Sequence, residues 1–276
     1  MNGTRLAETM MNATSLATGR APGCRTVMPA RRVFGAYLKE AQYESVRMLR
    51  SPAFGIPFLS LPVALYLLFA VLLFGEALRS DPKGALFVFA GFDVLGVMGP
   101  GMFGFGVVVA MEREQGLLTL KRALPMPPAA YLLAKMAMAT VFGVIVTATM
   151  IVAALTLGHL PLTAGQCFSV ATINILGALP FCVIGLFIGT RISAKAAPAI
   201  INVIYMAMIY LSGIMFPLPK IIQATAIIWP AYHLDHLMFR ALGASSQGAA
   251  TVHILVLASV TLLLTALSIR RLARVG

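Results

Sequence analysis

The segment MEREQGLLTLKRALPMPPAAYLLAK, residues 111–135, separates two long apolar runs with charges, a glycine and a proline cluster. The runs, roughly 85–110 before it and 129–158 from its end onward, are each long enough to cross a bilayer as a helix, which takes about 20 residues. A charged segment between two such runs has to leave the lipid. The pattern therefore predicts two membrane-spanning helices joined by a loop that carries the charges.

The composition extends this prediction to the whole chain. Of its 276 residues, 59% are hydrophobic and 11% are charged, whereas soluble domains carry roughly 25% charged residues. A soluble fold of this length could not bury so much apolar surface, which indicates a polytopic membrane protein. The formal net charge of +12 would suggest nucleic acid in a soluble protein. Here basic loops beside anionic lipid explain it, so no nucleic-acid partner is expected.

Six apolar segments are long enough to span the membrane. Lipid offers no hydrogen-bond partner to an open backbone, so each segment is expected to be a helix. The predicted fold class is therefore an all-α polytopic membrane protein with six transmembrane helices. The predicted spans are roughly 53–75, 85–110, 129–158, 167–190, 197–216 and 248–269.

The distribution of basic residues predicts the orientation of these spans. With the N-terminus in the cytoplasm, 17 of the 21 Lys and Arg residues fall inside. The other four are Arg79, Lys83, Lys220 and Arg240. Cytoplasmic loops carry the excess of positive charge, so both termini are expected in the cytoplasm. A multi-pass protein of a bacterial-type cytoplasmic (inner) membrane is the predicted location.

Three segments outside the spans have distinct patterns. Residues 1–33 contain no continuous apolar run and predict a flexible cytoplasmic tail rather than a signal peptide. FGAYLKEAQYESVRMLRSP, residues 34–52, predicts an amphipathic helix on the inner membrane surface, ended by Ser51-Pro52. LPKIIQATAIIWPAYHLDHLMFRALGASSQG, residues 218–248, is too interrupted to span and predicts an outer re-entrant segment.

The loop that begins at Glu112 has the pattern of a short amphipathic helix. Its apolar side consists of Leu117, Leu118, Leu120 and Leu124. Its charged side consists of Glu112, Arg113, Glu114, Lys121 and Arg122. Prolines at 125, 127 and 128 would end the helix. A helix this short is not stable alone in water, so it is expected to dock on the membrane or in a partner's groove.

The residues EREQG at 112–116, followed by Pro125 and by YLLAK at 131–135, resemble the ABC-2 family of ABC-transporter membrane subunits. The similarity is to its drug-export, daunorubicin-permease-like branch. The surface helix, the six spans and LSGIMFPLPKII at 211–222 extend the resemblance over residues 34–276, which would form one ABC-2 type transmembrane domain.

The resemblance implies the permease subunit of an ATP-driven exporter that moves hydrophobic or amphiphilic compounds, such as drugs, antibiotics or lipid-like molecules. In this family the loop is a coupling helix that sits in a cleft of a separate P-loop ATPase, present in two copies. A second permease copy, forming a homodimer, membrane lipid and the hydrophobic substrate would be the other partners. The implied ATPase-coupling residues are Glu112, Arg113, Glu114, Gly116, Leu117 and Leu120.

The sequence contains no Gly-Lys dipeptide and therefore no Walker A phosphate loop. Its three cysteines form neither a CxxC motif nor a Cys/His cluster. No catalytic, cofactor-binding or metal-binding residue is predicted, and the chain alone is not expected to be an enzyme. ATP and Mg would bind to the partner ATPase.

Alternatives to drug export remain. A polysaccharide or glycolipid ABC exporter would share the architecture, but that branch usually lacks the Glu-Arg-Glu-x-Gly pattern. A stand-alone secondary transporter or channel usually shows several intramembrane charges or an internal repeat, and neither is evident here. A membrane-embedded enzyme would need a paired acid/base or metal constellation.

Several residues inside or near the spans allow two interpretations. Asp93 is an acid within an apolar run, so it is a candidate for the substrate path; alternatively it lies near the outer mouth of its span. Gly185 and Gly189 form a GxxxG motif that would pack either within the subunit or against a second copy. The segment HLDH, residues 233–236, is expected to be a solvated turn, and His253 a packed or interfacial residue without an evident partner.

Overall fold

A computed structural model describes residues 30–117, 120 and 128–275 of the chain. Most of these residues are helical, and no strand occurs among them, as the composition predicts. Two units divide the chain, residues 1–35 and 36–276. The part of the first unit that is described is the start of α2 (Ala30–Leu49), and the following description concerns the second unit. The predicted tail, residues 1–33, lies almost entirely outside the described residues.

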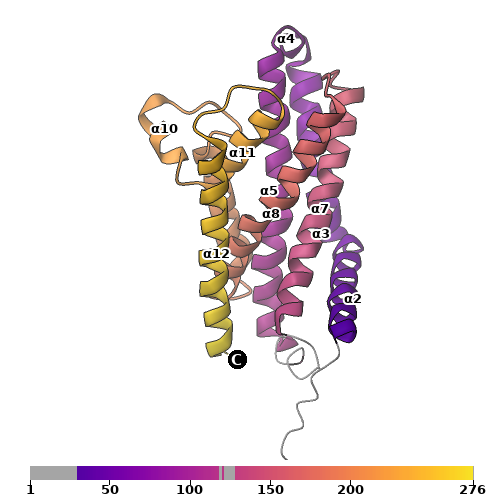
Figure 1. Cartoon of the computed structure of the whole chain (residues 1–276), viewed down its shortest axis with the longest axis vertical. Helices are drawn as coiled ribbons and strands as arrows, with labels where there is room; N and C mark the ends of the chain where they lie inside the picture. The colour runs from indigo at the N-terminus through magenta and orange to yellow at the C-terminus, as the bar shows by residue number, and fades with distance from the viewer. Residues whose placement is uncertain (1–29, 118–119, 121–127, 276) are drawn as a thin grey trace, which may run out of the picture. The chain divides into compact units, whose positions relative to one another are not determined.

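Five helical segments are long and apolar enough to cross a membrane (Figure 1). They are α3 (Pro52–Leu67) with its π-helical continuation Leu68–Leu73, α5 (Pro82–Glu114), α7 (Pro128–Thr156), α8 (Ala164–Gly189) and α12 (Ala250–Val275). They coincide with five of the six predicted spans, which confirms the all-α polytopic fold. Helix α5 ends at the lower end of Figure 1, and α4 (Gly75–Ser80) lies at the upper end.

The fifth predicted span, 197–216, is shorter in the structure. Its helix α9 (Ala197–Leu211) has 15 residues, fewer than the roughly 20 that cross a bilayer. It ends at Leu211, with Ser212 as its C-cap, because Gly213 follows in the left-handed conformation, with φ of 79°. The count of six spans therefore stays unconfirmed.

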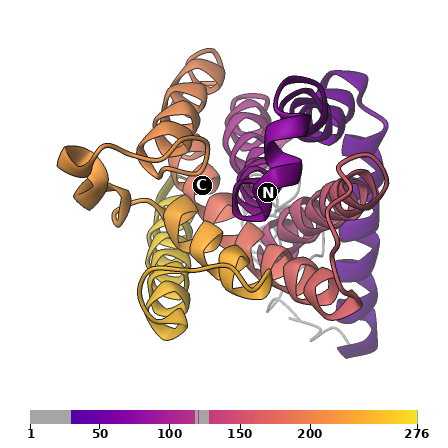
Figure 2. The same ribbon diagram turned by 90° about the horizontal axis from the view of Figure 1, so that it is seen from above.

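The predicted re-entrant segment contains two short helices, α10 (Lys220–Ala226) and α11 (Pro230–Ala241). Each begins directly after or at a proline, which has no backbone N–H to lose at a helix start. In Figure 2 α10 projects away from the long helices, whereas α11 lies across the upper ends of α8 and α12. Whether they enter a membrane stays a prediction.

Helix α5 is the centre of the unit and packs against α3, α7, α8, α9 and α11. Its closest neighbour is α8, and glycines allow the approach. A Cβ on Gly189 would lie 2.4 Å from the carbonyl oxygen of Gly106, and a Cβ on Gly185 would lie 2.6 Å from that of Met102. The GxxxG motif of α8 thus packs within the chain.

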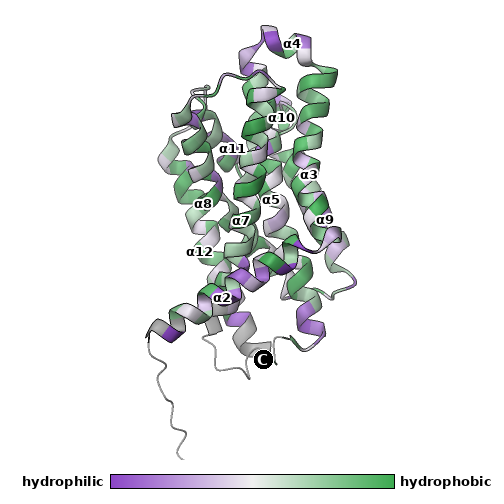
Figure 3. Ribbon diagram, turned by 90° about the vertical axis from the view of Figure 1, so that its right-hand side faces the viewer, coloured by the Kyte–Doolittle hydropathy of each residue, from purple (hydrophilic) through white to green (hydrophobic). Residues whose placement is uncertain are grey.

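The outward faces of the long helices are apolar (Figure 3). Large hydrophobic side chains such as Leu72, Phe168 and Leu262 are at least 70% exposed, which water would oppose and lipid permits. Hydrophilic residues gather on α2 and α4. The structure therefore presents a lipid-facing belt between two polar ends.

Candidate functional site

A buried cluster of charges lies at the lower end of the unit, where α2, α5 and α7 meet. Lys135 of α7 is fully buried, and Glu44 of α2 and Glu112 of α5 are 4% and 2% exposed. The Lys135 ammonium group donates hydrogen bonds to Glu44 and to Glu112 Oε1, the second at 3.2 Å. Buried charges persist only when they are paired and hydrogen-bonded, and here each is.

Two further side chains complete this cluster. The Tyr131 hydroxyl donates to Glu112 Oε2 at 2.6 Å, and Arg47 donates to Glu112 Oε1 at 2.8 Å. Arg47 is also 3.6 Å from Glu44. Partial burial lowers the pKa of Arg47, but the bond to Glu112 and the charges of both glutamates outweigh it, so this pKa lies above its ordinary value. Two carboxylates balance two cations. The term loop-base cluster refers below to Glu44, Arg47, Glu112, Tyr131 and Lys135.

Local helix geometry explains how five residues reach one point. Glu44 and Arg47 are three residues apart on α2, and Tyr131 and Lys135 are four apart on α7, so each pair shares one helix face. Glu112 lies in the last turn of α5. The loop that leaves α5 and enters α7 is therefore held at both ends by one set of ion pairs.

The end of α5 is also bonded to the turn between α8 and α9. Arg113 donates to the carbonyl oxygen of Ile192, and Glu114 accepts a hydrogen bond from the backbone N–H of Ala194 at 2.9 Å. Arg191, in the same turn, stacks over the ring of Phe187. A displacement of the end of α5 would therefore also displace the turn between α8 and α9.

The loop itself is described only at its start. Helix α5 ends at Glu114, and Gly116 follows with φ of 72°, a conformation that favours glycine. A new helical turn begins there, because Leu120 N–H donates to the Gly116 carbonyl oxygen at 3.2 Å. Leu117 is half-buried, and Leu120 is 64% exposed. The remaining residues of the predicted coupling helix, 118–119 and 121–124, and the linker 125–127 lie outside the described residues.

The predicted coupling residues therefore fall into two groups. Glu114, Gly116 and Leu120 lie at the surface or near it, whereas Glu112 points into the protein and is occupied by Arg47, Tyr131 and Lys135. Glu112 is thus not exposed in this structure, and the coupling role of the six residues stays a prediction. Sequence reasoning missed Glu44, Arg47, Tyr131 and Lys135 as its neighbours. Lys135, a lone cation just inside an apolar run, carried the same signal that singled out Asp93.

Asp93 lies in the interior of the bundle rather than near the mouth of its span. It is fully buried and accepts hydrogen bonds from Thr147 of α7 at 3.1 Å and from Asn174 of α8 at 2.7 Å. Asn174 also donates to the Thr147 hydroxyl at 2.6 Å. The carboxylate thus joins three spans, and it lines neither of the two cavities described in this structure.

The expectation of a solvated turn at HLDH is wrong. His233 and Asp235 are 1% and 4% exposed on α11, and the Nδ1 atoms of His233 and His253 lie 2.8 Å apart. His236 stacks on His253 with ring centroids 5.4 Å apart. The amphipathic period of α11 turns these side chains inward, and His253 has partners that the sequence alone did not indicate.

These features define a class: a multi-pass helical membrane protein whose polar loop is anchored in the bundle by buried ion pairs. Residues 40–239 match the model of the ABC-2 type transporter family, and the chain belongs to that family. It is 26% identical over 198 residues to "Putative transport permease YvfS" of Bacillus subtilis (strain 168), an alignment that covers 71% of this chain and 80% of that protein. The chain is thus a membrane subunit of ABC-transporter type, a family that works with a partner ATPase.

Proposed function

We propose that this chain is the permease of an exporter that moves hydrophobic or amphiphilic compounds out of the cytoplasm or the inner leaflet. A homodimer of permeases would work with two copies of a separate ATPase. The loop-base cluster is the observation that carries the proposal, because its ion pairs join the end of α5 and the first turns of α7, on either side of the loop, to each other and to α2. The lower end of Figure 1 would face the cytoplasm, in keeping with the basic residues of the α8–α9 turn and the end of α12.

In this proposal the surface of the loop and its base have different roles. Leu120 and the exposed Glu114 would contact the ATPase, the first through apolar burial and the second through its carboxylate. Glu112 would act as a positioning residue, since it holds the end of α5 against α2 and α7. ATP can shift the spans only through its different affinity for their two arrangements, and a rigid loop base transmits that difference.

The substrate class is inferred from the resemblance to the drug-export branch and from the apolar character of the spans. Asp93 stays a candidate for the substrate path. It would have to become accessible in another arrangement of α5, α7 and α8, because all three helices cover it in this one.

The test begins with the full chain, tagged and extracted from its native membrane in mild detergent. A P-loop ATPase should be recovered in a stoichiometric amount. Leu120→Glu should release the ATPase, whereas Leu120→Met, which keeps an apolar side chain of similar size, should retain it. In inverted membrane vesicles, ATP should then drive the accumulation of an amphiphilic fluorescent dye.

Recovery of the chain without any ATPase in several mild detergents would reject the proposal and favour a stand-alone transporter. Recovery of the ATPase together with uptake of a polysaccharide-linked lipid, but of no dye, would keep the coupling and reject the substrate class.

A further inference from the structure

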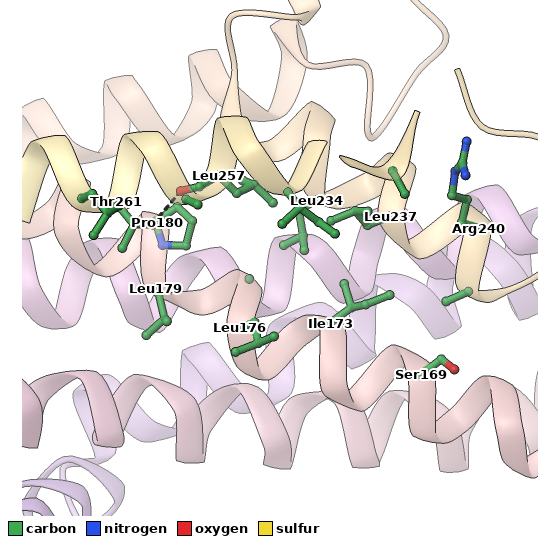
Figure 4. Close-up of a pocket in the computed structure, with 16 residues that line it drawn as sticks. Ser169, Ile173, Leu176, Leu179, Pro180, Leu234, Leu237, Arg240, Leu257 and Thr261 are labelled. Carbon is green, nitrogen blue, oxygen red and sulfur yellow. Dashed lines mark hydrogen bonds between the residues drawn. The ribbon is translucent and has the colours of Figure 1, made fainter. Parts of the chain in front are cut away.

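A cavity of about 700 Å³ opens between α8, α11 and α12 (Figure 4). It is separate from the loop-base cluster and from Asp93. Leu176 and Leu262 line it and are 62% and 72% exposed, so the cavity is open on the side where lipid surrounds the helices. Leu234 of α11 closes its inner wall against Gly177 of α8, where a Cβ would lie 2.4 Å from the leucine Cδ1.

The two hydroxyl-bearing residues that line the cavity do not make its walls polar. Ser169 donates its hydroxyl to the Gly165 carbonyl oxygen, and Thr261 donates to that of Leu257. Both hydroxyls are therefore satisfied within their own helices and offer little to a ligand. The remaining lining is aliphatic apart from Arg240. A molecule that fills this space must be a hydrocarbon chain or a similar apolar body.

Arg240 places a positive charge at one end of the cavity. Its stem lines the wall, and its guanidinium group is held there by Nε to the Ser246 hydroxyl at 2.9 Å and Nη2 to the Gly248 carbonyl oxygen at 2.6 Å. No carboxylate forms an ion pair with Arg240 among the residues that the structure describes. An anionic group bound at this end of the cavity would neutralise the charge of Arg240.

The dimensions match one leaflet of a bilayer. Along α8 the cavity extends from Ser169, at the end where Arg240 lies, to Pro180, beside Thr261 (Figure 4). At a rise of 1.5 Å per residue this is about 16 Å, and half of a hydrocarbon core is about 15 Å. Arg240 stands where the connection between α11 and α12 begins, which is the level at which long basic side chains meet lipid headgroups.

We propose that this cavity binds one acyl chain of an anionic phospholipid, with the phosphate-bearing headgroup on Arg240. The lipid would come from the leaflet at the upper end of Figure 1. It would brace α11 against α8 and α12, which otherwise leave this space between them.

Native mass spectrometry of the full chain, released from bilayer discs of phosphatidylcholine and phosphatidylglycerol, tests the proposal. The wild-type chain should retain one phosphatidylglycerol, with about five-fold preference over phosphatidylcholine, since a basic residue near the surface contributes about 1 kcal/mol. Arg240→Gln should lose the preference, and Lys220→Gln, which removes an exposed charge elsewhere in the same segment, should keep it.

The apolar part of the site has its own pair of variants. Ala258→Trp should fill the cavity and abolish retention of either lipid. Ser259→Trp places the same ring on the adjacent exposed position, outside the lining, and should retain the lipid. Equal retention of both lipids by the wild-type chain, or an unchanged preference in Arg240→Gln, would overturn the proposal. Efficient cross-linking between two copies through Ala258→Cys would show instead that a second permease covers the cavity.

Discussion

Lys135 and Glu112 face each other across the base of the loop, with the lysine Nζ 3.2 Å from the glutamate Oε1 and both side chains buried. One residue lies in the last turn of α5 and the other in the second turn of α7. The ion pair therefore closes the loop 115–127 at its base. Glu44 of α2 forms an ion pair with the same lysine, so the ammonium group of Lys135 links α7 to both α2 and α5.

Replacing Lys135 by Met should destabilise the protein strongly. The change leaves Glu44 and Glu112 in a buried site with Arg47 as the one cation paired with them among the described residues. Breaking a buried pair in this way costs about 3–5 kcal/mol. Denaturant unfolding of the purified chain in detergent measures the loss. Lys39→Met, on an exposed position of α2, should stay within about 0.5 kcal/mol of the wild type.

The ion pair between Lys135 and Glu44 can also be tested by changing the glutamate. Adding Glu44→Gln to Lys135→Met removes one of the two stranded carboxylates and should recover part of the stability. If the double variant is as unstable as the sum of the two single variants, Lys135 and Glu44 do not interact in the folded protein.

Glu114→Ala should reduce coupling while leaving stability nearly unchanged. The residue is exposed, and in the described part of the chain its carboxylate accepts one hydrogen bond, from the Ala194 backbone N–H. We expect the purified complex to hydrolyse ATP while its stimulation by transported substrate falls several-fold. Glu76→Ala, on an exposed position of α4 at the other end of the unit, serves as a comparison for a lost surface carboxylate. A Glu114→Ala complex with full stimulation and full export would remove Glu114 from the coupling residues.

Most of the fold could be predicted because lipid permits few alternatives. Five spans follow from length and hydropathy alone, since an apolar run of this length has to be helical in a bilayer. The shortened α9 could not be foreseen from apolar content, because the run continues through Ile214, Met215 and Phe216 while the helix ends at Leu211, two residues before Gly213. Its end depends on a backbone conformation, which hydropathy does not register.

The site was harder to predict than the spans. The loop was found because charges and prolines interrupt apolar sequence, but the partners of Glu112 lie on other helices. Glu44 and Lys135 are 91 residues apart in the chain, and no periodicity within one helix relates them. The likeness of EREQG to the family pattern also assigned Glu112 to the partner surface, although it lies in the last turn of α5 and faces inward.

The two glycines of the GxxxG motif should tolerate no added methyl group. Gly185→Ala and Gly189→Ala each bring a Cβ within 2.6 Å or less of a backbone oxygen of α5. The backbone has to move, and such overpacking costs about 1–3 kcal/mol. Gly165→Ala, in the same helix with no atom within 4 Å of the new Cβ, should be neutral or slightly stabilising. Thermal unfolding of the three variants compares them directly.

Thr147 should contribute more to the stability of the protein than Thr149, which lies two residues further along α7. Thr147→Val removes the hydroxyl that both Asp93 and Asn174 contact, and an unpaired buried polar group costs about 1–3 kcal/mol. Thr149 is exposed and bonds only within its own helix, so Thr149→Val should change stability by at most about 0.5 kcal/mol. Detergent-solubilised unfolding distinguishes the two.

The variant Asp93→Asn distinguishes a structural role of Asp93 from a role in transport. The amide keeps an acceptor for Thr147 but loses the negative charge, so folding should largely survive. If Asp93 faces the substrate path in another arrangement, resistance to cationic compounds should fall while resistance to neutral ones persists. Unchanged resistance to every cationic compound would leave Asp93 with a packing role alone.

Acidification should weaken the contact between α11 and α12 through His236. Burial, together with the neighbouring His253 and His233, lowers the pKa of His236 to about 4, against an ordinary value of about 6.5. The unfolded chain therefore binds more protons than the folded chain between these values. The contribution of neutral His236 is complete above about pH 6.5 and is lost as the pH falls toward 4.

His236→Gln should remove this part of the acid sensitivity, because the amide oxygen can still accept the bond that Gln247 N–H now donates to His236 Nδ1 at 3.3 Å. The rings in contact with His236 are those of Tyr232, Phe239 and His253, and His233 acts on it through its charge. Burial also lowers the pKa of His233, and it raises that of Asp235, which has the opposite effect on acidification. Both remain in the variant and cancel in the comparison. The difference in melting temperature between pH 7 and pH 5 should therefore be smaller for His236→Gln than for the wild type, and an equal difference would assign the acid sensitivity to other groups.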